Sequence, residues 1–310
     1  MLAKCAHVPT RSRSIASATV PPAFVKVLIV NADDFGLSQE VNAAVVRAHR
    51  EGILTSASLM VAEEHCDEAA RIAKENPGLD VGLHAVVCKG RSVRPAAEIA
   101  PAVDAAGRFP ENPVLAGMRW YFAKELRAKL ATELRAQVER HLELVGYLNH
   151  IDGHLNFHVH PVVADILVEL AIEYKVPCLR LPREPVFTTL RLRRDNAARK
   201  LVESVIFRTL SRRTRRMMNE RGLKSTDWLF GLHQSGHLDE NYILAIIDRL
   251  RDGTTELYFH PAMDIGVTPP AASAQIEVEI LTSPRVRDAL AARGVSLTNF
   301  AQQARAASAV

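Results

Sequence analysis

The sequence predicts an α/β fold in which parallel strands are joined by crossover helices. Short runs rich in Val, Ile and Leu alternate with longer segments of helical periodicity, which is the order typical of parallel sheets. A chain of 310 residues, 48% of them hydrophobic, can bury the core of one barrel or of two domains. Strands are expected near 25–32, 54–61, 79–86, 149–154, 176–181, 227–232 and 254–260. Helices are expected near 38–51, 63–76, 123–146, 161–174, 239–251 and 284–293.

Several boundaries follow from residues that end strands or cap helices. Gly36 permits a bend after the first strand, and the first helix is expected to begin near Ser38. Ser283 and Pro284 occupy the cap and first-turn positions of the last expected helix. We expect a single domain over 25–300.

The two ends of the chain are expected to be tails. Residues 1–24 contain Arg and several Ser but no acid, and they lack the apolar block of a secretory signal. We expect a flexible tail there, although a transit peptide or a misplaced start codon would explain the same composition. Residues 301–310 are expected to form a C-terminal tail.

Hydropathy and cysteine usage predict a cytoplasmic protein. No apolar stretch reaches the ~18–20 residues that a membrane helix needs. The four cysteines form no Cys-x-x-Cys pair, so we expect free thiols in a reducing compartment. They are Cys5, Cys66, Cys88 and Cys178. A metal in this protein would therefore not be held by sulfur.

Two adjacent carboxylates, Asp33 and Asp34, follow the first apolar run. Neighbouring side chains of a strand face opposite ways, so both can serve one site only if the chain bends there. Two carboxylates in one cleft raise each other's pKa, and a cation beside them keeps both ionised. The pair therefore indicates a metal site. The alternative is that both residues only turn the chain and cap the next helix.

Histidines after two further strands support the metal site. His84 follows the strand near 79–86, and His154 lies in a segment where four of the chain's 12 histidines occur within residues 150–160. Asp34, His84 and His154 would complete a set of two imidazoles and one carboxylate with an open position for water. A lone histidine is more often an ordinary core or surface residue, so the spacing alone leaves this open.

Five motifs, in order, resemble those of the YdjC-like carbohydrate deacetylase family. They begin at Asn31 (NADDFGLS), Gly52 (GILTSASLM), Gly82 (GLH), Asp152 (DGH) and Glu256 (ELYFHP). The resemblance covers roughly residues 25–295. It implies a distorted, TIM-like α/β barrel in which the carboxyl ends of the strands carry the site.

The resemblance also implies a role for each motif residue. Asp34, His84 and His154 resemble the metal ligands, and Asp33 resembles the general base. Zinc is favoured, and Mg, Mn or Co fits the same ligand types. Arg180 resembles the arginine that orients the base, and His260 resembles a general acid for the leaving amine. An ordinary salt bridge and a structural histidine are the alternatives for these last two residues.

Within the family, the segment around His154 is most similar to the hopanoid-biosynthesis-associated branch. Many members carry a denser histidine string where this chain has Leu155 and Asn156, which argues against a chitooligosaccharide substrate. Asn156 and His158 are expected to bind substrate or to support the ligands. The predicted activity is removal of an N-acetyl group from an amino sugar on a hopanoid lipid. The rivals are another metal-dependent hydrolysis and a non-catalytic sugar- or lipid-binding protein.

Two segments are expected to be additions to the barrel. Residues 89–120 form a long insertion after the His84 strand that would cover the cleft, or else only pack on the surface. Residues 191–222 contain eleven Lys/Arg and three acids, a local charge of +8 in a chain of +4. Apolar residues recur there at helical spacing, which predicts a basic amphipathic helix.

This helix has three interpretations. It could lie on an anionic membrane, which would place the protein peripherally on the inner membrane, or be an outer barrel helix with its apolar stripe on the core. A nucleic-acid patch is disfavoured because the segment has one aromatic residue, Phe207. We therefore expect no nucleic-acid partner, and a homo-oligomer is compatible with the sequence.

Overall fold

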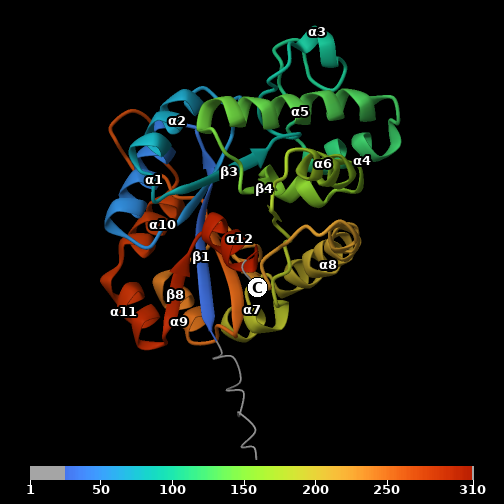
Figure 1. The fold of residues 1–310 in the computed structure, drawn as a ribbon. Helices are drawn as coiled ribbons and strands as arrows, with labels where there is room; N and C mark the ends of the chain where they lie inside the picture. The colour runs from blue at the N-terminus through green and yellow to red at the C-terminus, as the bar shows by residue number, and fades with distance from the viewer. Residues whose placement is uncertain (1–24, 309–310) are drawn as a thin grey trace, which may run out of the picture.

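Strand β1 (Lys26–Phe35) lies at the centre of a parallel sheet in the computed structural model, which describes residues 25–308 (Figure 1). The strand order is β5-β4-β3-β2-β1-β7-β6. The other strands are β2 (Ser56–Leu59), β3 (Asp80–Ala85), β4 (His150–Gly153), β5 (Cys178–Leu179), β6 (Trp228–Phe230), β7 (Gly253–Phe259) and β8 (Val295–Thr298). Every ladder between them is parallel, as the alternating pattern predicts.

The predicted distorted barrel is confirmed, and two features account for its distortion. Strand β5 is only two residues long, and β5 approaches the segment before β6 through a single bridge between Cys178 and Lys224. In addition, β8 pairs with Lys26–Ile29, the first part of β1, while β2 pairs with its last part. Since β7 follows β1 along both parts, β8 and β2 must share the opposite edge of β1.

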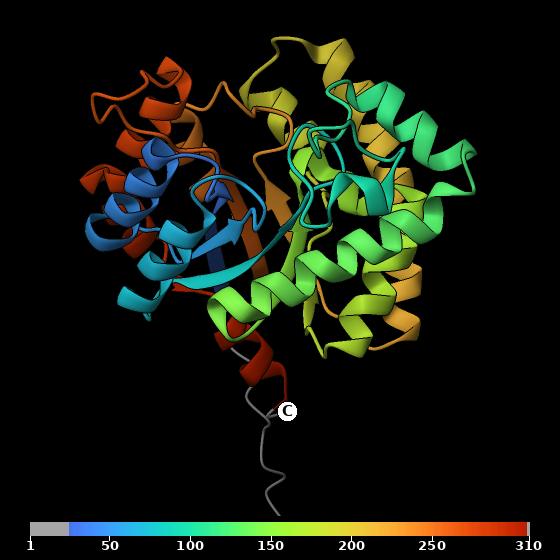
Figure 2. The same cartoon turned by 90° about the horizontal axis from the view of Figure 1, so that it is seen from above.

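Helices surround the sheet, with α1 and α10 packed on each other at one side and α5, α6 and α8 at the other (Figure 2). The helices are α1 (Gln39–Glu51), α2 (Cys66–Glu75), α3 (Ala96–Ile99), α4 (Pro113–Phe122), α5 (Leu126–Val145), the 3₁₀ segment η1 (His154–Val159), α6 (Pro161–Glu173), α7 (Val186–Leu192), α8 (Ala197–Glu220), α9 (Glu240–Ile247), α10 (Ala272–Thr282), α11 (Pro284–Ala292) and α12 (Phe300–Ser308). None of the helices in residues 25–308 combines the length and the apolarity that crossing a bilayer requires.

The predicted helix starts are confirmed by their caps. The Ser38 hydroxyl accepts a hydrogen bond from the backbone N–H of Val41 at the start of α1. The Ser283 hydroxyl does the same for Val286 at the start of α11, with Pro284 in the first turn. Each cap satisfies an N–H that has no partner within the helix.

The C-terminal end differs from the expectation of a tail at 301–310. Helix α12 extends to Ser308, and Phe300 at its start is buried, with its ring stacked 3.9 Å from that of His150. One aromatic side chain thus fixes the helix against the sheet, a contact that local periodicity does not reveal. Helix α10 and strand β8 were also missing from the expectation. The expected tail at 1–24 lies outside the described residues.

The two additions to the barrel are structured. Within the insertion at 89–120, the backbones of Arg91 and Arg108 form an isolated antiparallel β-bridge. The segment also contains α3 and most of α4. The basic segment at 191–222 forms α8, as the helical spacing predicts. The interpretation of α8 as an outer helix with its apolar stripe on the core is wrong, because Leu201, Val202, Val205 and Ile206 are exposed.

The buried face of α8 consists instead of mostly polar side chains. Lys200, Ser211 and Thr214 are buried there with Met218. The ammonium group of Lys200 contacts the backbone oxygen of Arg193 and the carboxylate of Asp195. These partners satisfy a cation that burial would otherwise penalise.

Candidate active site and metal centre

A bulge at the end of β1 brings both neighbouring aspartates into one cleft. Between the pairs Ala32–Ala57 and Phe35–Leu59, β1 carries one more residue than β2. Asp34 has a positive φ of 64°, a conformation that Asp adopts more readily than most residues. The bend that the two carboxylates require is therefore built at Asp34 itself, and Asp33 and Asp34 both line the cleft.

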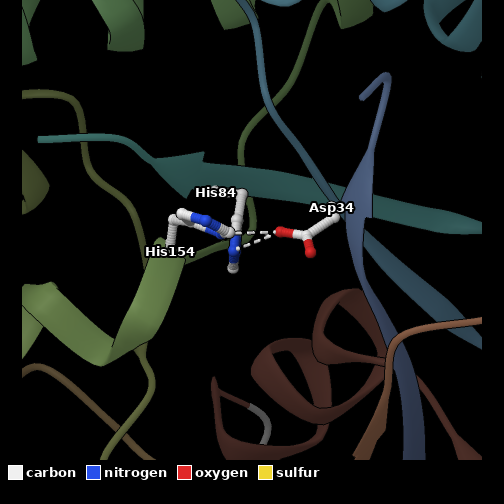
Figure 3. A group of neighbouring side chains, drawn as sticks. All are labelled: Asp34, His84 and His154. Carbon is white, nitrogen blue, oxygen red and sulfur yellow. Dashed lines mark hydrogen bonds and ion pairs between the residues drawn. The ribbon is translucent and has the colours of Figure 1, made fainter. Parts of the chain in front are cut away.

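The carboxylate of Asp34 contacts the imidazoles of both His84 and His154 (Figure 3). Its Oδ1 lies 2.8 Å from Nδ1 of His154, at the start of η1, and 3.2 Å from Nε2 of His84, on β3. The three ligand atoms come from three different elements and lie within 4.8 Å of one another. Burial opposes ionisation of Asp34, but the two imidazoles hold its pKa well below the usual range.

The orientation of His84 is fixed from behind by Asp152. Nδ1 of His84 donates to Oδ1 of Asp152 at 2.7 Å, which leaves Nε2 directed at Asp34. A carboxylate behind a histidine in this way fixes the tautomer of a metal ligand. Burial would lower the pKa of His84, but the carboxylates around it raise that pKa to about 10. A cation in the cluster would take the place of this proton.

Arg180, which follows β5, joins three buried carboxylates. It binds both oxygens of Asp33, at 2.7 and 2.8 Å, and contacts Asp152 at 2.8 Å and Glu256 at 2.7 Å. Burial disfavours its charge, but these carboxylates hold the pKa of Arg180 well above its usual range. For Glu256, burial outweighs the guanidinium and raises the pKa to about 7.

These contacts separate the roles of the two aspartates. Asp33, His84 and Asp152 form a second cluster of potential ligand atoms. In that cluster Arg180 occupies both oxygens of Asp33, and Asp152 is bonded to His84, Arg180 and the hydroxyl of Ser58. In the described part of the chain, Asp34 contacts no guanidinium or ammonium group, and its partners are the imidazoles of His84 and His154. The donor set that fits a metal is therefore Asp34, His84 and His154.

The cleft over this cluster has a polar floor and a mostly apolar wall, with a volume of about 940 Å³. The floor includes His154, Asn156, Tyr258 and His260 besides the two aspartates. The apolar part of the wall is formed by residues of the insertion, η1 and α8, among them Pro113, Val114, Leu155, Phe157, Ile206, Phe207 and Leu210. The same elements also contribute the charged side chains of Lys89, Arg108, Glu111 and Glu203. The insertion at 89–120 thus lines the cleft.

Tyr258 connects the floor to the buried network. The Arg180 guanidinium lies 4.7 Å from the centre of its ring, and Tyr258 lines the cleft together with Asn156. The ring of His260 packs edge-on against Tyr258 at 5.6 Å, and its backbone N–H donates to Glu277. These contacts direct the imidazole of His260 toward the cleft that it lines.

Most of the predicted site residues line the cleft or lie directly beneath it, and His158 is buried away from the cleft surface. Asp33, Asp34, His154, Asn156 and His260 line the cleft, while His84 and Arg180 lie directly beneath it. His158 is fully buried against Gly153, and burial lowers its pKa to about 4. It does not line the cleft, so of the two roles expected for it, support of the ligands is the one that its position leaves open.

Three residues of the network were not assigned a role from the sequence: Asp152, Glu256 and Tyr258. Alternate residues of a strand share a face, so Asp152 lies on the face of His154, and Glu256, Tyr258 and His260 recur at the same spacing. This two-residue repeat was the signal in the sequence that could have identified the three residues. The shared partner of the carboxylates, Arg180, lies on a separate strand, and only the fold reveals the contact.

Two histidines and paired aspartates at the strand ends of this α/β barrel form a candidate metal centre. The chain belongs to the YdjC-like protein family, whose model matches residues 27–292. This confirms the family predicted from the motifs.

Individual relatives cover nearly the whole chain. A carbohydrate deacetylase of Geobacillus stearothermophilus is 33% identical over 278 residues, which cover 88% of this chain and 96% of that protein. A chitooligosaccharide deacetylase of Proteus mirabilis (strain HI4320) is 28% identical over 284 residues, or 88% and 97% of the two chains. A solved Enterococcus faecalis V583 protein, named for cellobiose-phosphate cleavage, has the same fold, with a TM-score of 0.70 at 23% identity over 90% of this chain and 99% of that one.

The contact between Asp152 and His84 predicts an effect on metal affinity. Asp152→Asn removes the charge that fixes the His84 tautomer, so zinc affinity should fall about 10–100-fold. Competition with a chromophoric chelator measures this affinity. Glu169→Gln, which alters an exposed pair with Arg221, is the control. Equal zinc affinity of Asp152→Asn and the control would show that Asp152 does not orient the ligand.

Proposed function

We propose that this protein is a metal-dependent hydrolase that removes an N-acetyl group from an amino sugar. The observation that carries the proposal is the convergence of Asp34, His84 and His154 beside Asp33, which is held by Arg180, in an open cleft. The carbohydrate deacetylases among its relatives support the sugar as the substrate class.

The donor set fits a divalent metal held by Oδ1 of Asp34, Nε2 of His84 and Nδ1 of His154. One carboxylate and two imidazoles suit zinc, and Mg, Mn or Co accepts the same donor types. When bound, such a metal polarises the amide carbonyl and increases the acidity of a coordinated water. Asp152 would keep the His84 ring in place for it.

The remaining residues supply proton transfers and orientation. Asp33 accepts the proton of the attacking water, and its two contacts with Arg180 hold the carboxylate in one orientation. His260 donates a proton to the departing amine, because an amine cannot leave as an anion. Its packing on Tyr258 holds the ring beside the cleft.

The apolar wall supports a substrate whose sugar is attached to a lipid. A free oligosaccharide offers hydroxyl groups along its length, whereas Val114, Phe157, Ile206 and Leu210 offer no hydrogen-bonding side chain. Together with the resemblance to the hopanoid-associated branch, this makes an N-acetylglucosaminyl hopanoid, a bacteriohopanetetrol glycoside of hopanoid side-chain biosynthesis, the proposed substrate. A chitooligosaccharide is the second candidate, favoured by the relative from Proteus mirabilis.

A non-catalytic sugar- or lipid-binding protein is the rival of a different class. Binding requires neither a base held by a guanidinium nor an imidazole beside it. The presence of Asp33, Arg180 and His260 around one cleft therefore supports an enzyme. For its location we propose the cytoplasm, where the thiols of Cys66, Cys88 and Cys178 would remain free, as they are in the structure.

The substrate is tested by mass spectrometry on the zinc-loaded protein. N-acetylglucosaminyl hopanoid and short chitooligosaccharides are offered separately, and release of acetate is followed together with loss of the acetyl mass. We expect faster turnover of the hopanoid glycoside because most of the cleft wall is apolar. Faster turnover of chitooligosaccharides would favour the second candidate, and turnover of neither would favour the binding protein.

The ligand assignment predicts that Asp34→Ala, His84→Ala and His154→Ala each lose bound metal and activity together. Three protein ligands are the usual set of a catalytic zinc centre, and each variant leaves two. Metal content by mass spectrometry and acetate release are measured on the same samples. The exposed His237 provides the control variant His237→Ala. Full metal stoichiometry in the three variants would remove the assignment.

The division of roles between the aspartates is tested by a matched pair, Asp33→Asn and Asp34→Asn. Asp33→Asn should retain the metal but lose a factor on the order of 10²–10⁴ in turnover, as expected for a missing general base. Asp34→Asn should lose metal affinity. Near-normal turnover of Asp33→Asn at full metal content would assign the base to another group.

A further inference from the structure

Helix α8 presents its apolar stripe to the outside. Val205 is 67% exposed and Val202 60%, while Leu201 and Ile206 are about half exposed. These residues lie on one face, and the opposite face, with Lys200 and Ser211, is the one packed against the barrel. An apolar stripe in this orientation contributes little to the core, and exposed apolar patches of this kind mark candidate sites of contact with a protein or a membrane.

Helix α4 carries a second exposed apolar stripe. Val114, Leu115, Met118, Tyr121 and Phe122 follow the spacing of one helix face, and Phe122 is 71% exposed. The opposite face of α4 is anchored by Trp120, which is buried and donates its indole N–H to the backbone oxygen of Val87. The orientation of α4 is thus fixed with the stripe outward.

The two stripes belong to one region of the surface. Helices α4 and α8 both pack against α6 and lie with it on one side of the sheet (Figure 1). They meet at the candidate active site, because Val114 of α4 and Ile206 of α8 line the same cleft. Of the 19 large apolar side chains exposed in residues 25–308, nine lie on these two helices. We call these nine side chains the docking surface.

The exposed face of α8 becomes basic beyond its apolar part. Arg212 and Arg216 lie 7 and 11 residues after Val205 and therefore on the same face, flanked by Arg208 and Arg215. All four are exposed. None of the four forms an ion pair with a carboxylate in the described part of the chain, whereas the neighbouring Arg213 is paired with Asp165. Four cations are thus available to an external anion.

We propose that the docking surface, together with Arg208, Arg212, Arg215 and Arg216, binds the surface of an anionic phospholipid bilayer. Exposed aromatic and aliphatic side chains enter the boundary between headgroups and acyl chains, and arginines beside them attract anionic lipids. Both chemistries occur together here. In this arrangement only one face of α4 and one face of α8 enter the bilayer surface, and neither helix crosses the bilayer.

A second copy of this chain fits the same surface less well. In a symmetric dimer formed through this face, the four arginines of each copy would meet either arginines or apolar side chains of the other. The first arrangement repels, and the second removes charges from water without a partner. A nucleic acid would match the arginines but not the apolar stripe. A bilayer interface satisfies both parts.

Docking in this way would place the mouth of the cleft at the membrane. Residues of both helices form part of the cleft wall, so the sugar of a lipid-linked substrate could enter the cleft while its lipid part stays in the bilayer. This consequence rests on the proposed function, whereas binding to the membrane does not. The experiment therefore measures vesicle binding separately from hydrolysis.

The full-length protein is sedimented with vesicles of phosphatidylcholine, with and without phosphatidylglycerol. One variant combines Leu115→Ser, Met118→Ser, Phe122→Ser, Val202→Ser and Val205→Ser, and a second combines Arg208→Gln, Arg212→Gln, Arg215→Gln and Arg216→Gln. None of these residues lines the cleft. Matched controls change the same number of residues elsewhere on the surface. The apolar control combines Val25→Ser, Ile265→Ser, Val267→Ser, Ile276→Ser and Leu297→Ser, and the basic control combines Arg71→Gln, Lys74→Gln, Arg249→Gln and Arg305→Gln.

We expect the wild type and both controls to bind the anionic vesicles, and binding to weaken with added salt. The arginine variant should lose on the order of a hundredfold or more in vesicle affinity, and the apolar variant should lose binding as well. Deacetylation of a soluble, tail-less acetylated sugar should stay nearly unchanged in both variants, which also shows that they fold.

Two outcomes would overturn the proposal. Equal vesicle binding by the wild type and both variants at low salt would show that this surface does not contact lipid. A wild-type dimer in light scattering that the apolar variant converts to monomers, without any vesicle binding, would assign the surface to a second copy of the chain. Failure of the sugar assay alone would contradict the proposed function and leave the vesicle result intact.

Discussion

The buried guanidinium of Arg180 holds together the ends of strands that the chain builds far apart. It contacts Asp33 on β1, Asp152 on β4 and Glu256 on β7, and all four side chains are almost completely inaccessible to water. Removing one partner of such a buried pair costs about 3–5 kcal/mol, because the charges that remain are left uncompensated. The geometry of the candidate active site therefore depends on this one cation.

This arrangement explains how two neighbouring aspartates can differ in chemistry. Arg180 binds Asp33 through both oxygens, whereas the bulge at Asp34 turns that carboxylate toward His84 and His154. The proposed base, fixed by a guanidinium, and the proposed metal ligand, directed at two imidazoles, are thereby placed at adjacent positions. Asp152 connects the two halves, since it contacts Arg180 through one oxygen and His84 through the other.

The strand-end residues could be predicted from the sequence because each follows an apolar run, and parallel strands bring such ends together. That argument and the motifs identified Asp34, His84 and His154, which converge in the structure. It could not identify Glu256 as a partner of Arg180, because their contact spans 76 positions and depends on the curvature of the sheet. For His158 the sequence left open whether it binds substrate or supports the ligands, and the turn through η1 directs it inward, away from the cleft.

Helical periodicity alone also could not predict how α8 packs on the barrel. The spacing identified an amphipathic helix but not which face is buried, and the barrel buries the face with Lys200. Small polar side chains pack closely there, and Lys200 finds oxygen partners, so the apolar stripe is left exposed beside α4. The sequence defined the stripe, and only the packing shows that it is available to a partner.

The central claim, that Asp34 and not Asp33 binds the metal, is tested most directly by a crystal structure of the zinc-loaded protein with anomalous data at the zinc edge. We predict one strong anomalous peak among Oδ1 of Asp34, Nε2 of His84 and Nδ1 of His154, with both oxygens of Asp33 still bound to Arg180. A peak bonded to Asp33 with Arg180 displaced, or no peak in this cluster from protein that contains stoichiometric zinc, would contradict the account.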